Sequence, residues 1–306
     1  TQDGVARFLG IPYAAPPVGA LRWRAPEPPV TWAGTRPATA FGSPCVQSDK
    51  LEGPGSEDCL FLNVWSPEVG ATTPRPVMVY VHGGGWARGA GNMSVFDGIE
   101  NMQDGQHLAA QDGVVVVTLN YRLSNLGFLA HPALAEGGSA GNYGVMDVIA
   151  ALKWVQANIR AFGGDPGRVL LFGTSAGGSQ TCAVASSPLA RGLFSAVASH
   201  SGGGCDCFRD DQKLAVAELV AQRVGCANAA DVAACLRKVP AADFVPLPGV
   251  GATADGVVLP TCPLERFRAG GGPGVPMVFG TNVHEGIGYL DDAARALTWD
   301  SLRLLF

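Results

Sequence analysis

The chain has 306 residues, of which 47% are hydrophobic and 15% charged, and its net charge is −5. This composition predicts a folded chain with a large buried core and excludes a disordered one. A net acidic chain lacks the clustered Lys and Arg residues that bind nucleic acid. No apolar run in the sequence approaches the roughly 18 residues needed to span a bilayer. We expect one large domain, because open α/β folds often exceed 200 residues as single units.

Short β-branched runs alternate along the chain with longer stretches of helical periodicity. Residues 1–65 are rich in Pro and Trp, and we expect them to wrap around the sheet as loops and small antiparallel strands. Unbroken apolar strands are typical of a mostly parallel sheet with helices on both faces, so the predicted class is α/β. The predicted strands are 77–81, 114–119, 169–172, 196–200 and 276–280, and the predicted helices are 146–162, 175–185 and 211–224.

The predicted strand 169–172 runs into the sequence GTSAGG at 173–178, which opens a helical stretch. This is a G-x-S-x-G pattern in its required context, between a strand and a helix. Its glycines permit a sharp turn that lifts the Ser175 hydroxyl above the sheet and aims the first helix amides at an attacked carbonyl. An ordinary Gly-rich turn is the alternative, but the flanking elements favour a nucleophile.

A second glycine loop, HGGGW at 82–86, follows the predicted strand 77–81. Only glycine lets backbone amides approach an oxyanion closely, so this loop is typical of acyl transfer. Phosphate binding is the alternative, yet no P-loop Lys and no dinucleotide fingerprint accompany the glycines. We expect His82 to hold the loop by hydrogen bonding rather than to act as a base.

The eight cysteines form groups by spacing. Two pairs bracket short loops that each could close, and such bridges would imply an oxidising compartment. A zinc site is not expected, because the repeated CxxC or HxxxH spacing is absent. Cys205 and Cys207 should find separate partners, such as Cys262, or stay free, and Cys182 is expected to be a buried thiol. The two loop pairs are Cys45 with Cys59 and Cys226 with Cys235.

These and further motifs stand in the order found in the type B carboxylesterase and cholinesterase family of α/β-hydrolases, which the chain resembles over nearly its whole length. The resemblance implies the α/β-hydrolase fold and a serine carboxylic ester hydrolase that forms an acyl-enzyme with a small-molecule ester. It implies no cofactor and no metal. The further motifs are FLGIPYA at 8–14, the stretch 17–24, SEDCLFLNV at 56–64, NYR at 120–122 and GNYG at 141–144 with Asp147.

The resemblance implies a role for each site residue. Ser175 is the nucleophile, Glu285 is the triad acid, and the amides of Gly84, Gly85 and Ala176 form the oxyanion hole. Glu285 also follows the predicted strand 276–280, and sites in open α/β sheets gather beyond the carboxyl ends of strands.

Other matching positions have structural roles in the family that the chain resembles. Ser201 corresponds to a serine that supports the triad from beside it. The resemblance also implies two buried ion pairs and two loop disulfides, which are Arg122–Asp147, Arg22–Glu57, Cys45–Cys59 and Cys226–Cys235.

The chain departs from the family pattern at Thr174, where the family usually has Glu. A carboxylate beside the nucleophile favours a protonated histidine, so the electrostatic effect of this threonine is open.

A second departure concerns the base that the serine needs. No histidine follows Glu285 in these 306 residues. His107 and His131 are expected at the surface, His284 adjoins the acid, and His200, at the end of a predicted strand, is the one plausible substitute. We expect the base to be a histidine beyond residue 306, which makes residues 1–306 an incomplete hydrolase domain that alone hydrolyses esters very slowly or not at all.

Other functions on the same fold remain open. A non-catalytic cholinesterase-like interaction domain is one alternative, although Ser175, its glycines and Glu285 are all present. A lipase or amidase is a closer one. Cholinesterase activity is not expected, because 46–58 contains no aromatic residue for a cation–π contact. The inferred disulfides favour a secreted or periplasmic location, although no targeting peptide is visible, and the oligomeric state is not predicted.

Overall fold

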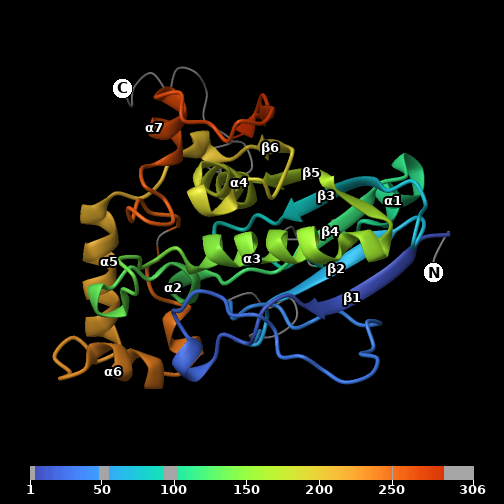
Figure 1. Cartoon of the computed structure of the whole chain (residues 1–306). Coiled ribbons are helices and arrows are strands. Elements are labelled where there is room, and N and C mark those ends of the chain that lie inside the picture. The colour runs from blue at the N-terminus through green and yellow to red at the C-terminus, as the bar shows by residue number, and fades with distance from the viewer. Residues whose placement is uncertain (1–3, 48–54, 93–102, 250, 286–306) are drawn as a thin grey trace, which may run out of the picture.

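A computed structural model of the chain describes residues 4–47, 55–92, 103–249 and 251–285 (Figure 1). Within these ranges the strands form one sheet in the order β1-β2-β4-β3-β5-β6-β7. β4, β3, β5, β6 and β7 run parallel, and β1 and β2 pair antiparallel at one edge. The mostly parallel α/β class is confirmed. The bounds are β1 Ala6–Pro12, β2 Phe61–Ser66, β3 Arg75–Val81, β4 Val115–Leu119, β5 Gly164–Thr174, β6 Ala196–His200 and β7 Met277–Gly280.

The three predicted helices are present as α3, α4 and α5, and α3 continues into a 3-10 turn. Four shorter helices were not predicted, because five to seven residues are too few to show a helical period. The α-helices are α1 Gln106–Asp112, α2 Ser124–Phe128, α3 Tyr143–Asn158, α4 Ala176–Ser186, α5 Asp210–Arg223, α6 Val232–Lys238 and α7 Pro263–Arg268. The 3-10 turns are Gly19–Leu21, Pro132–Leu134, Ile159–Phe162, Pro188–Ala190, Gly203–Cys205 and Ala241–Phe244.

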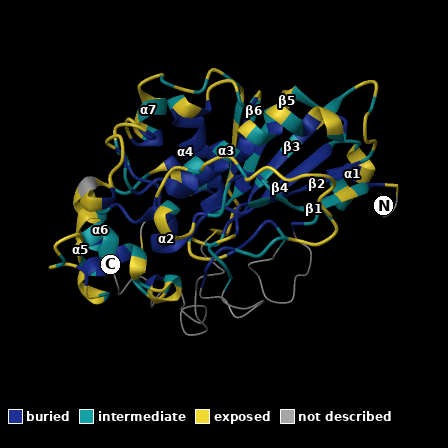
Figure 2. Ribbon diagram, turned by 60° about the horizontal axis from the view of Figure 1, so that its bottom comes forward, coloured by how far each residue is buried: buried dark blue, intermediate teal, exposed yellow. Residues whose placement is uncertain are grey.

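Helices cover both faces of the sheet, as β4 shows. Successive side chains of a strand point to opposite faces. Val115 and Val117 belong to the buried cluster that contains Leu152 of α3, whereas Val116 between them packs with Ala109 of α1. All five residues of β4 are buried, and Figure 2 shows the buried colour concentrated on the central strands. Figure 1 shows α5 and α6 beyond the carboxyl ends of the parallel strands.

The N-terminal region contains short antiparallel strands. β1 and β2 pair antiparallel and extend the main sheet, since β2 also pairs antiparallel with β4. They join it because β2 is apolar on both faces and almost wholly buried. The described parts of the segment between them form loops, in which Trp23 is fully buried and donates its indole N–H to the Asn125 carbonyl at 2.8 Å.

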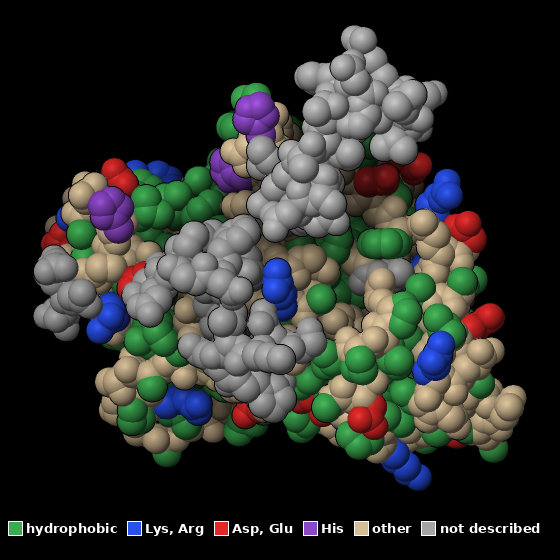
Figure 3. Space-filling model, turned by 180° about the vertical axis from the view of Figure 1, so that it is seen from behind, with side chains coloured by type: hydrophobic (Ala, Val, Ile, Leu, Met, Phe, Trp, Pro, Cys, Tyr) green, Lys and Arg blue, Asp and Glu red, His purple; other side chains and the backbone are tan. Residues whose placement is uncertain are grey.

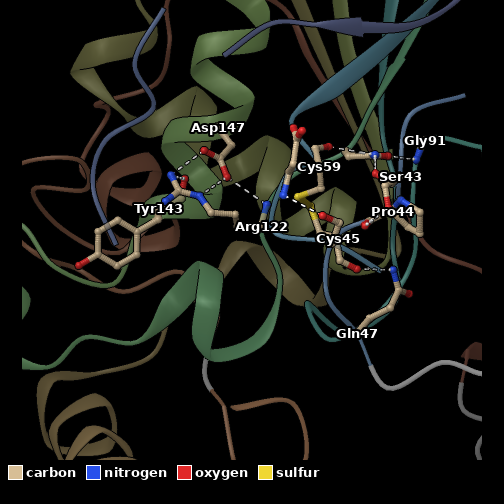
Figure 4. Close-up of a disulfide and its surroundings, with 12 residues drawn as sticks. Ser43, Pro44, Cys45, Gln47, Cys59, Gly91, Arg122, Tyr143 and Asp147 are labelled. Carbon is tan, nitrogen blue, oxygen red and sulfur yellow. Dashed lines mark hydrogen bonds and ion pairs between the residues drawn. A yellow bond between two sulfur atoms is a disulfide. The ribbon is translucent and has the colours of Figure 1, made fainter. Parts of the chain in front are cut away.

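Two arginine–carboxylate pairs tie distant segments together. Arg122, just after β4, donates to Asp147 of α3 from Nε at 2.8 Å and from Nη2 at 2.7 Å (Figure 4). Arg22 donates to Glu57 from Nε and Nη2, each at 2.6 Å. These are the two ion pairs that the family resemblance implies, and both are bidentate.

Every cysteine of the chain is in a disulfide. Two bridges join the pairs that the resemblance implies, and Cys207 is bonded to Cys262. The prediction that Cys182 is a buried thiol was wrong, because a 3-10 turn after β6 packs against α4 and brings Cys205 to it. Figure 4 shows the Cys45–Cys59 bridge together with the Arg122–Asp147 ion pair. The bridges are Cys45–Cys59, Cys182–Cys205, Cys207–Cys262 and Cys226–Cys235.

Candidate active site

Ser175 occupies the tight turn between β5 and α4. Its φ of 58° and ψ of −127° are a backbone conformation that residues with a side chain rarely adopt. Its N–H donates to the carbonyl of His200 at 2.9 Å, which fastens the turn to the end of β6. Strained backbone held in this way by its surroundings is characteristic of functional positions. The turn places the serine at the carboxyl edge of the sheet and at the amino end of a helix.

The glycines around the serine are required by packing. A Cβ on Gly177 would lie 2.1 Å from the carbonyl oxygen of Val81, and one on Gly178 would lie 2.7 Å from that of His200. A Cβ on Gly173 would lie 2.6 Å from the Gly177 carbonyl oxygen. Since all these neighbours are backbone atoms, they cannot rotate away. The turn is therefore packed directly against the ends of β3 and β6.

The second glycine loop passes beside Ser175. A Cβ on Gly83 would lie 2.7 Å from the Thr174 carbonyl oxygen and 3.1 Å from Cβ of Ser175. Gly84 and Gly85 then follow with φ of 111° and 64°, in the left-handed region that favours glycine. The structure thus brings together the two glycine motifs, which lie far apart in the sequence.

Ala176 is the first residue of α4, so its N–H is one of the helix amides that have no partner within the helix. It adjoins Ser175, beside which the Gly83 loop passes. The oxyanion hole made of the amides of Gly84, Gly85 and Ala176 stays a prediction, and this arrangement is compatible with it.

His82 is completely buried beneath the loop. Its Nδ1 lies 2.8 Å from the Gly83 carbonyl oxygen, and its ring stacks on Tyr121 with centroids 4.4 Å apart. Burial lowers the pKa of His82 to about 4, against the opposing effect of the Gly83 hydrogen bond. The imidazole is therefore neutral at pH 7, and Nδ1 carries the proton because it faces a carbonyl. This placement suits a residue that holds the loop.

Thr174, the departure from the family pattern, is partly buried at the end of β5. Its side chain is hydrogen-bonded to Tyr80 of β3. Burial raises the pKa of Tyr80, and the Thr174 hydrogen bond opposes that rise. The position before Ser175 therefore holds a neutral hydroxyl, paired with that of Tyr80, where the family usually has a carboxylate.

Glu285 lies beyond β7 and contacts Ser201. The Asn282 N–H donates to Oε1 of Glu285 at 2.7 Å, and the Asn282 side-chain amide donates to the Ser201 hydroxyl oxygen at 3.3 Å. Hydrogen bonding from the Ser201 hydroxyl and from the Asn282 N–H lowers the pKa of Glu285. Ser201 is in turn held by its N–H, which donates to the Gly280 carbonyl at 2.7 Å. Glu285 is thus ionised at neutral pH and attached to the ends of β6 and β7.

The structure gives none of the five histidines a hydrogen bond to the Ser175 hydroxyl within the described residues. His82 is buried, and His131 is partly exposed, with its Nδ1 accepting from the N–H of Ala133 to cap a 3-10 turn. The exposed histidines are His107, His200 and His284.

The backbone of His200 connects Ser175 to the neighbouring strands β5 and β7. It pairs in register with Thr174 of β5 and Gly280 of β7, and its carbonyl receives the Ser175 N–H. One residue further on, Ser201 contacts Glu285. Two adjacent residues at the end of β6 therefore link the serine turn to the acid.

Some site contacts were not foreseen from the sequence. Asn282, which donates to Glu285, and Tyr80, which bonds Thr174, were both missed. A signal exists for Asn282, since it lies two residues after the end of β7 and precedes Glu285 by three positions. No local signal exists for Tyr80, because it lies on a different strand from Thr174.

Several kinds of site are not seen in the described part of the chain. No three His, Cys, Asp or Glu side chains gather there as metal ligands would, and no helix there has the length and apolar character needed to cross a bilayer. On the face drawn in Figure 3, Lys and Arg side chains are scattered among acidic ones.

Nearly the whole chain matches a known family. A family model described as the carboxylesterase family covers residues 1–299. The chain belongs to the carboxylesterase family. The expected family membership is thereby confirmed.

Relatives of this carboxylesterase-family chain include named esterases. The fumonisin B1 esterase of Sphingopyxis macrogoltabida is 42% identical in an alignment 313 residues long, which covers 95% of this chain and 55% of that protein. The para-nitrobenzyl esterase of Bacillus subtilis is 39% identical, over 94% of this chain and 60% of that protein. Neuroligin-2 of Homo sapiens is 34% identical, over 95% of this chain and 40% of that protein. The carboxylesterase-family chain thus spans about half the length of these curated relatives.

Solved structures agree with the fold. A carboxylesterase of Geobacillus stearothermophilus matches with a TM-score of 0.85 at 34% identity, over 100% of this chain and 64% of that one. A structure titled PNB esterase matches with a TM-score of 0.86 at 36% identity, over 99% and 65%. The α/β-hydrolase fold expected of a carboxylesterase-family chain is confirmed.

Proposed function

We propose that residues 1–306 are the serine-bearing part of a carboxylic ester hydrolase that acts through an acyl-enzyme on Ser175. The observation that carries this proposal is the backbone of Ser175, held at φ 58° between β5 and α4 with Gly83 packed against it. Relatives that are named as esterases support an ester as the substrate. The natural ester is left open.

In the proposed reaction the Ser175 oxygen attacks the ester carbonyl carbon. The resulting oxyanion faces the amides of Gly84, Gly85 and Ala176, and each such donor supplies on the order of 3 kcal/mol of transition-state stabilisation. The alcohol leaves with a proton from the base, and water then hydrolyses the acyl-enzyme. Glu285, ionised and fixed by Ser201, orients the base. No step requires a metal or cofactor.

The base is proposed to be a histidine outside residues 1–306. His82 is buried and bonded to its own loop, His131 caps a turn, and the other three are exposed and make no hydrogen bond to Ser175 in the described residues. Serine without a base is a poor nucleophile. The chain 1–306 alone is therefore expected to hydrolyse esters very slowly or not at all.

Imidazole in solution can test the serine and the missing base together. We expect residues 1–306 to hydrolyse p-nitrophenyl acetate slowly, with a rate that rises on adding imidazole beyond the reaction of imidazole with the ester alone. Ser175→Ala should lose this increase, whereas Ser195→Ala should retain it. Ser195 is the matched control, because it is an exposed serine at the opposite, amino end of β6.

Two outcomes would overturn parts of this proposal. Equal rates for the unchanged chain and Ser175→Ala at every imidazole concentration would remove Ser175 as nucleophile. A normal enzymatic rate without imidazole, lost in His200→Gln, would instead assign the base to His200.

A non-catalytic interaction domain is the second candidate function, since neuroligin-2, a relative 34% identical over 95% of this chain, is not named as an esterase. The intact serine turn argues against it. A fluorophosphonate that forms a covalent adduct on Ser175 in the presence of imidazole supports the esterase, and absence of any adduct supports the interaction domain. A lipase or amidase shares the same residues, so rates on nitrophenyl esters of increasing chain length and on nitroanilides distinguish them.

We also propose that the protein is secreted or periplasmic. Four disulfides fit an oxidising compartment, since cytosolic thiols are kept reduced. Protein taken directly from its compartment should show no alkylatable thiol before reduction and eight after it, one for each cysteine. Eight reactive thiols before reduction would contradict this location.

A further inference from the structure

Residues 201–208, between β6 and α5, are here called the stapled segment. Two disulfides start from cysteines inside this segment. Cys205 is bonded to Cys182 of α4, and Cys207 is bonded to Cys262, the residue just before α7. Cys182 lies about two helical turns after Ser175. α7 leads into β7 and then to Glu285. The stapled segment is therefore joined covalently to α4, which follows the proposed serine, and to the start of α7, which precedes β7 and the proposed acid.

The backbone of the stapled segment needs external support. Ser201 and Cys205 have φ of 52° and 61°, and Gly203 and Gly204 have 64° and 81°. Left-handed backbone at residues with side chains persists only where the surrounding structure holds it. Cys205 is itself both a left-handed residue and a disulfide partner, so its bridge to α4 acts where that support is needed.

The start of the stapled segment is fixed beside the nucleophile helix. Ser179 of α4 donates its hydroxyl to the Gly202 carbonyl at 2.5 Å. A Cβ on Gly202 would lie 2.5 Å from Oγ of Ser199 and 2.8 Å from the carbonyl carbon of Gly178. Ser201, the residue before Gly202, is thus held in the position from which its hydroxyl reaches Glu285.

The end of the stapled segment contacts the HGGGW loop at 82–86, here called the oxyanion loop. Phe208 donates its N–H to the Ala252 carbonyl at 2.9 Å, and its ring packs edge-on against Trp86 with centroids 6.1 Å apart. Trp86 is the last residue of the HGGGW loop, and it also has left-handed backbone, with φ of 58°. Serine helix, acid and oxyanion loop therefore all contact this one stretch of eight residues.

We infer that the bridges Cys182–Cys205 and Cys207–Cys262 position the site for the reaction. They hold Ser201 against Glu285 and Phe208 against the oxyanion loop. This rests on the proposed esterase function. Reduction by a dithiol would convert each bridge into two thiols and the dithiol into its cyclic disulfide, and would release the stapled segment. The site is then sensitive to thiol reductants through these two bridges.

Double Cys→Ser variants of each bridge test the inference, with Cys226→Ser/Cys235→Ser as the matched control, since that bridge lies in a separate buried cluster beside α6. The first readout is the pKa of Glu285, followed by carbon-13 NMR of labelled glutamate carboxyls and assigned with Glu285→Gln. We expect this pKa to rise in both bridge variants and in Ser201→Ala, and to stay unchanged in the control. The second readout is imidazole-dependent fluorophosphonate labelling of Ser175, expected to slow at least threefold in the bridge variants alone.

The outcomes separate this inference from the esterase proposal. If Ser201→Ala moves the Glu285 pKa but neither bridge variant does, the bridges only add stability and the inference is wrong. If the bridge variants move that pKa while Ser175 is labelled in no chain, the positioning stands and the esterase proposal fails. Should a variant not fold, as judged by circular dichroism, graded reduction of the unchanged chain replaces it, with the opened bridge identified by alkylation and mass spectrometry.

Discussion

Gly177 lies inside helix α4, where helix propensity by itself favours alanine by about 1 kcal/mol. The surroundings oppose that preference. A Cβ there would lie 2.1 Å from the carbonyl oxygen of Val81 and 2.7 Å from that of His82. Both atoms belong to the backbone where β3 enters the glycine loop, so they can yield only if that backbone shifts. The same glycine that weakens the helix allows it to start beside the sheet.

We predict that Gly177→Ala lowers the free energy of unfolding by about 2–3 kcal/mol, the cost of overpacking, measured by urea denaturation. Gly272→Ala is the control, because nothing lies within 4 Å of its Cβ position. It should change stability by no more than about 0.5 kcal/mol. A Gly177→Ala chain as stable as the unchanged one would contradict the close packing of α4 on β3.

His82 makes stability depend on pH. Its pKa is about 4 in the folded chain, because the ring is buried, whereas an unfolded histidine titrates near 6.5. Between these values the unfolded chain binds a proton that the folded chain does not. The free energy of unfolding therefore falls as pH is lowered from about 6.5 to about 4, by on the order of 3 kcal/mol in total.

The prediction is that His82→Gln unfolds with a smaller dependence on pH over that range. Urea denaturation at several pH values measures it, and the difference in slope between the two chains isolates His82 from carboxylates that titrate in both. Parallel pH profiles would show that His82 is not held neutral in the folded chain.

At the scale of elements, the Arg122–Asp147 pair holds the chain just after β4 against α3. The two side chains are 5% and 0% exposed, and Asp147 also accepts the Arg122 backbone N–H at 3.0 Å. Removing one partner of a buried pair leaves the other charge without compensation, which costs about 3–5 kcal/mol.

We therefore predict that Asp147→Asn lowers the free energy of unfolding by about that amount in urea denaturation. Glu68→Gln breaks an exposed ion pair, in which the Glu68 side chain is 54% exposed and the Arg75 side chain 36%. This change should cost less than about 1 kcal/mol. Equal losses for the two variants would mean that burial does not determine the strength of these pairs.

Strands were predicted better than short helices, for physical reasons. The apolar run of β6 was predicted at its observed bounds of 196–200. β5 begins earlier than predicted, because Gly164 pairs with Arg75 of β3 although the residues after Gly164 are not apolar. Pairing with a neighbouring strand extends β5 where hydrophobic periodicity gives no signal. α2, at 124–128, was missed because five residues are too few to show a helical period, and its buried polar residues Ser124 and Asn125 give it no apolar stripe.

At the scale of the whole molecule, the Cys45–Cys59 bridge attaches the N-terminal loops to the main core. Both cysteines are buried in the largest cluster, and 14 positions separate them. Closing a loop of that size stabilises a folded chain by about 3 kcal/mol, chiefly through the entropy of the unfolded state.

We predict that Cys45→Ala/Cys59→Ala loses about that free energy of unfolding in urea without reductant. In dithiothreitol sufficient to open all the bridges, most of the difference between this variant and the unchanged chain should disappear. A difference of the same size in reductant would assign the stabilisation to sulfur packing rather than to the crosslink.

The sequence by itself determined the family, the class of sheet and the two glycine motifs beside Ser175. It could do so because each motif is local: a strand, a turn of a few residues, and a helix or loop that follows. Only the tertiary structure decided the partners of Cys182 and Cys205 and the contact of Ser201 with Glu285. These depend on β6 lying between β5 and β7, an order set by long-range packing that residue spacing along the chain does not carry.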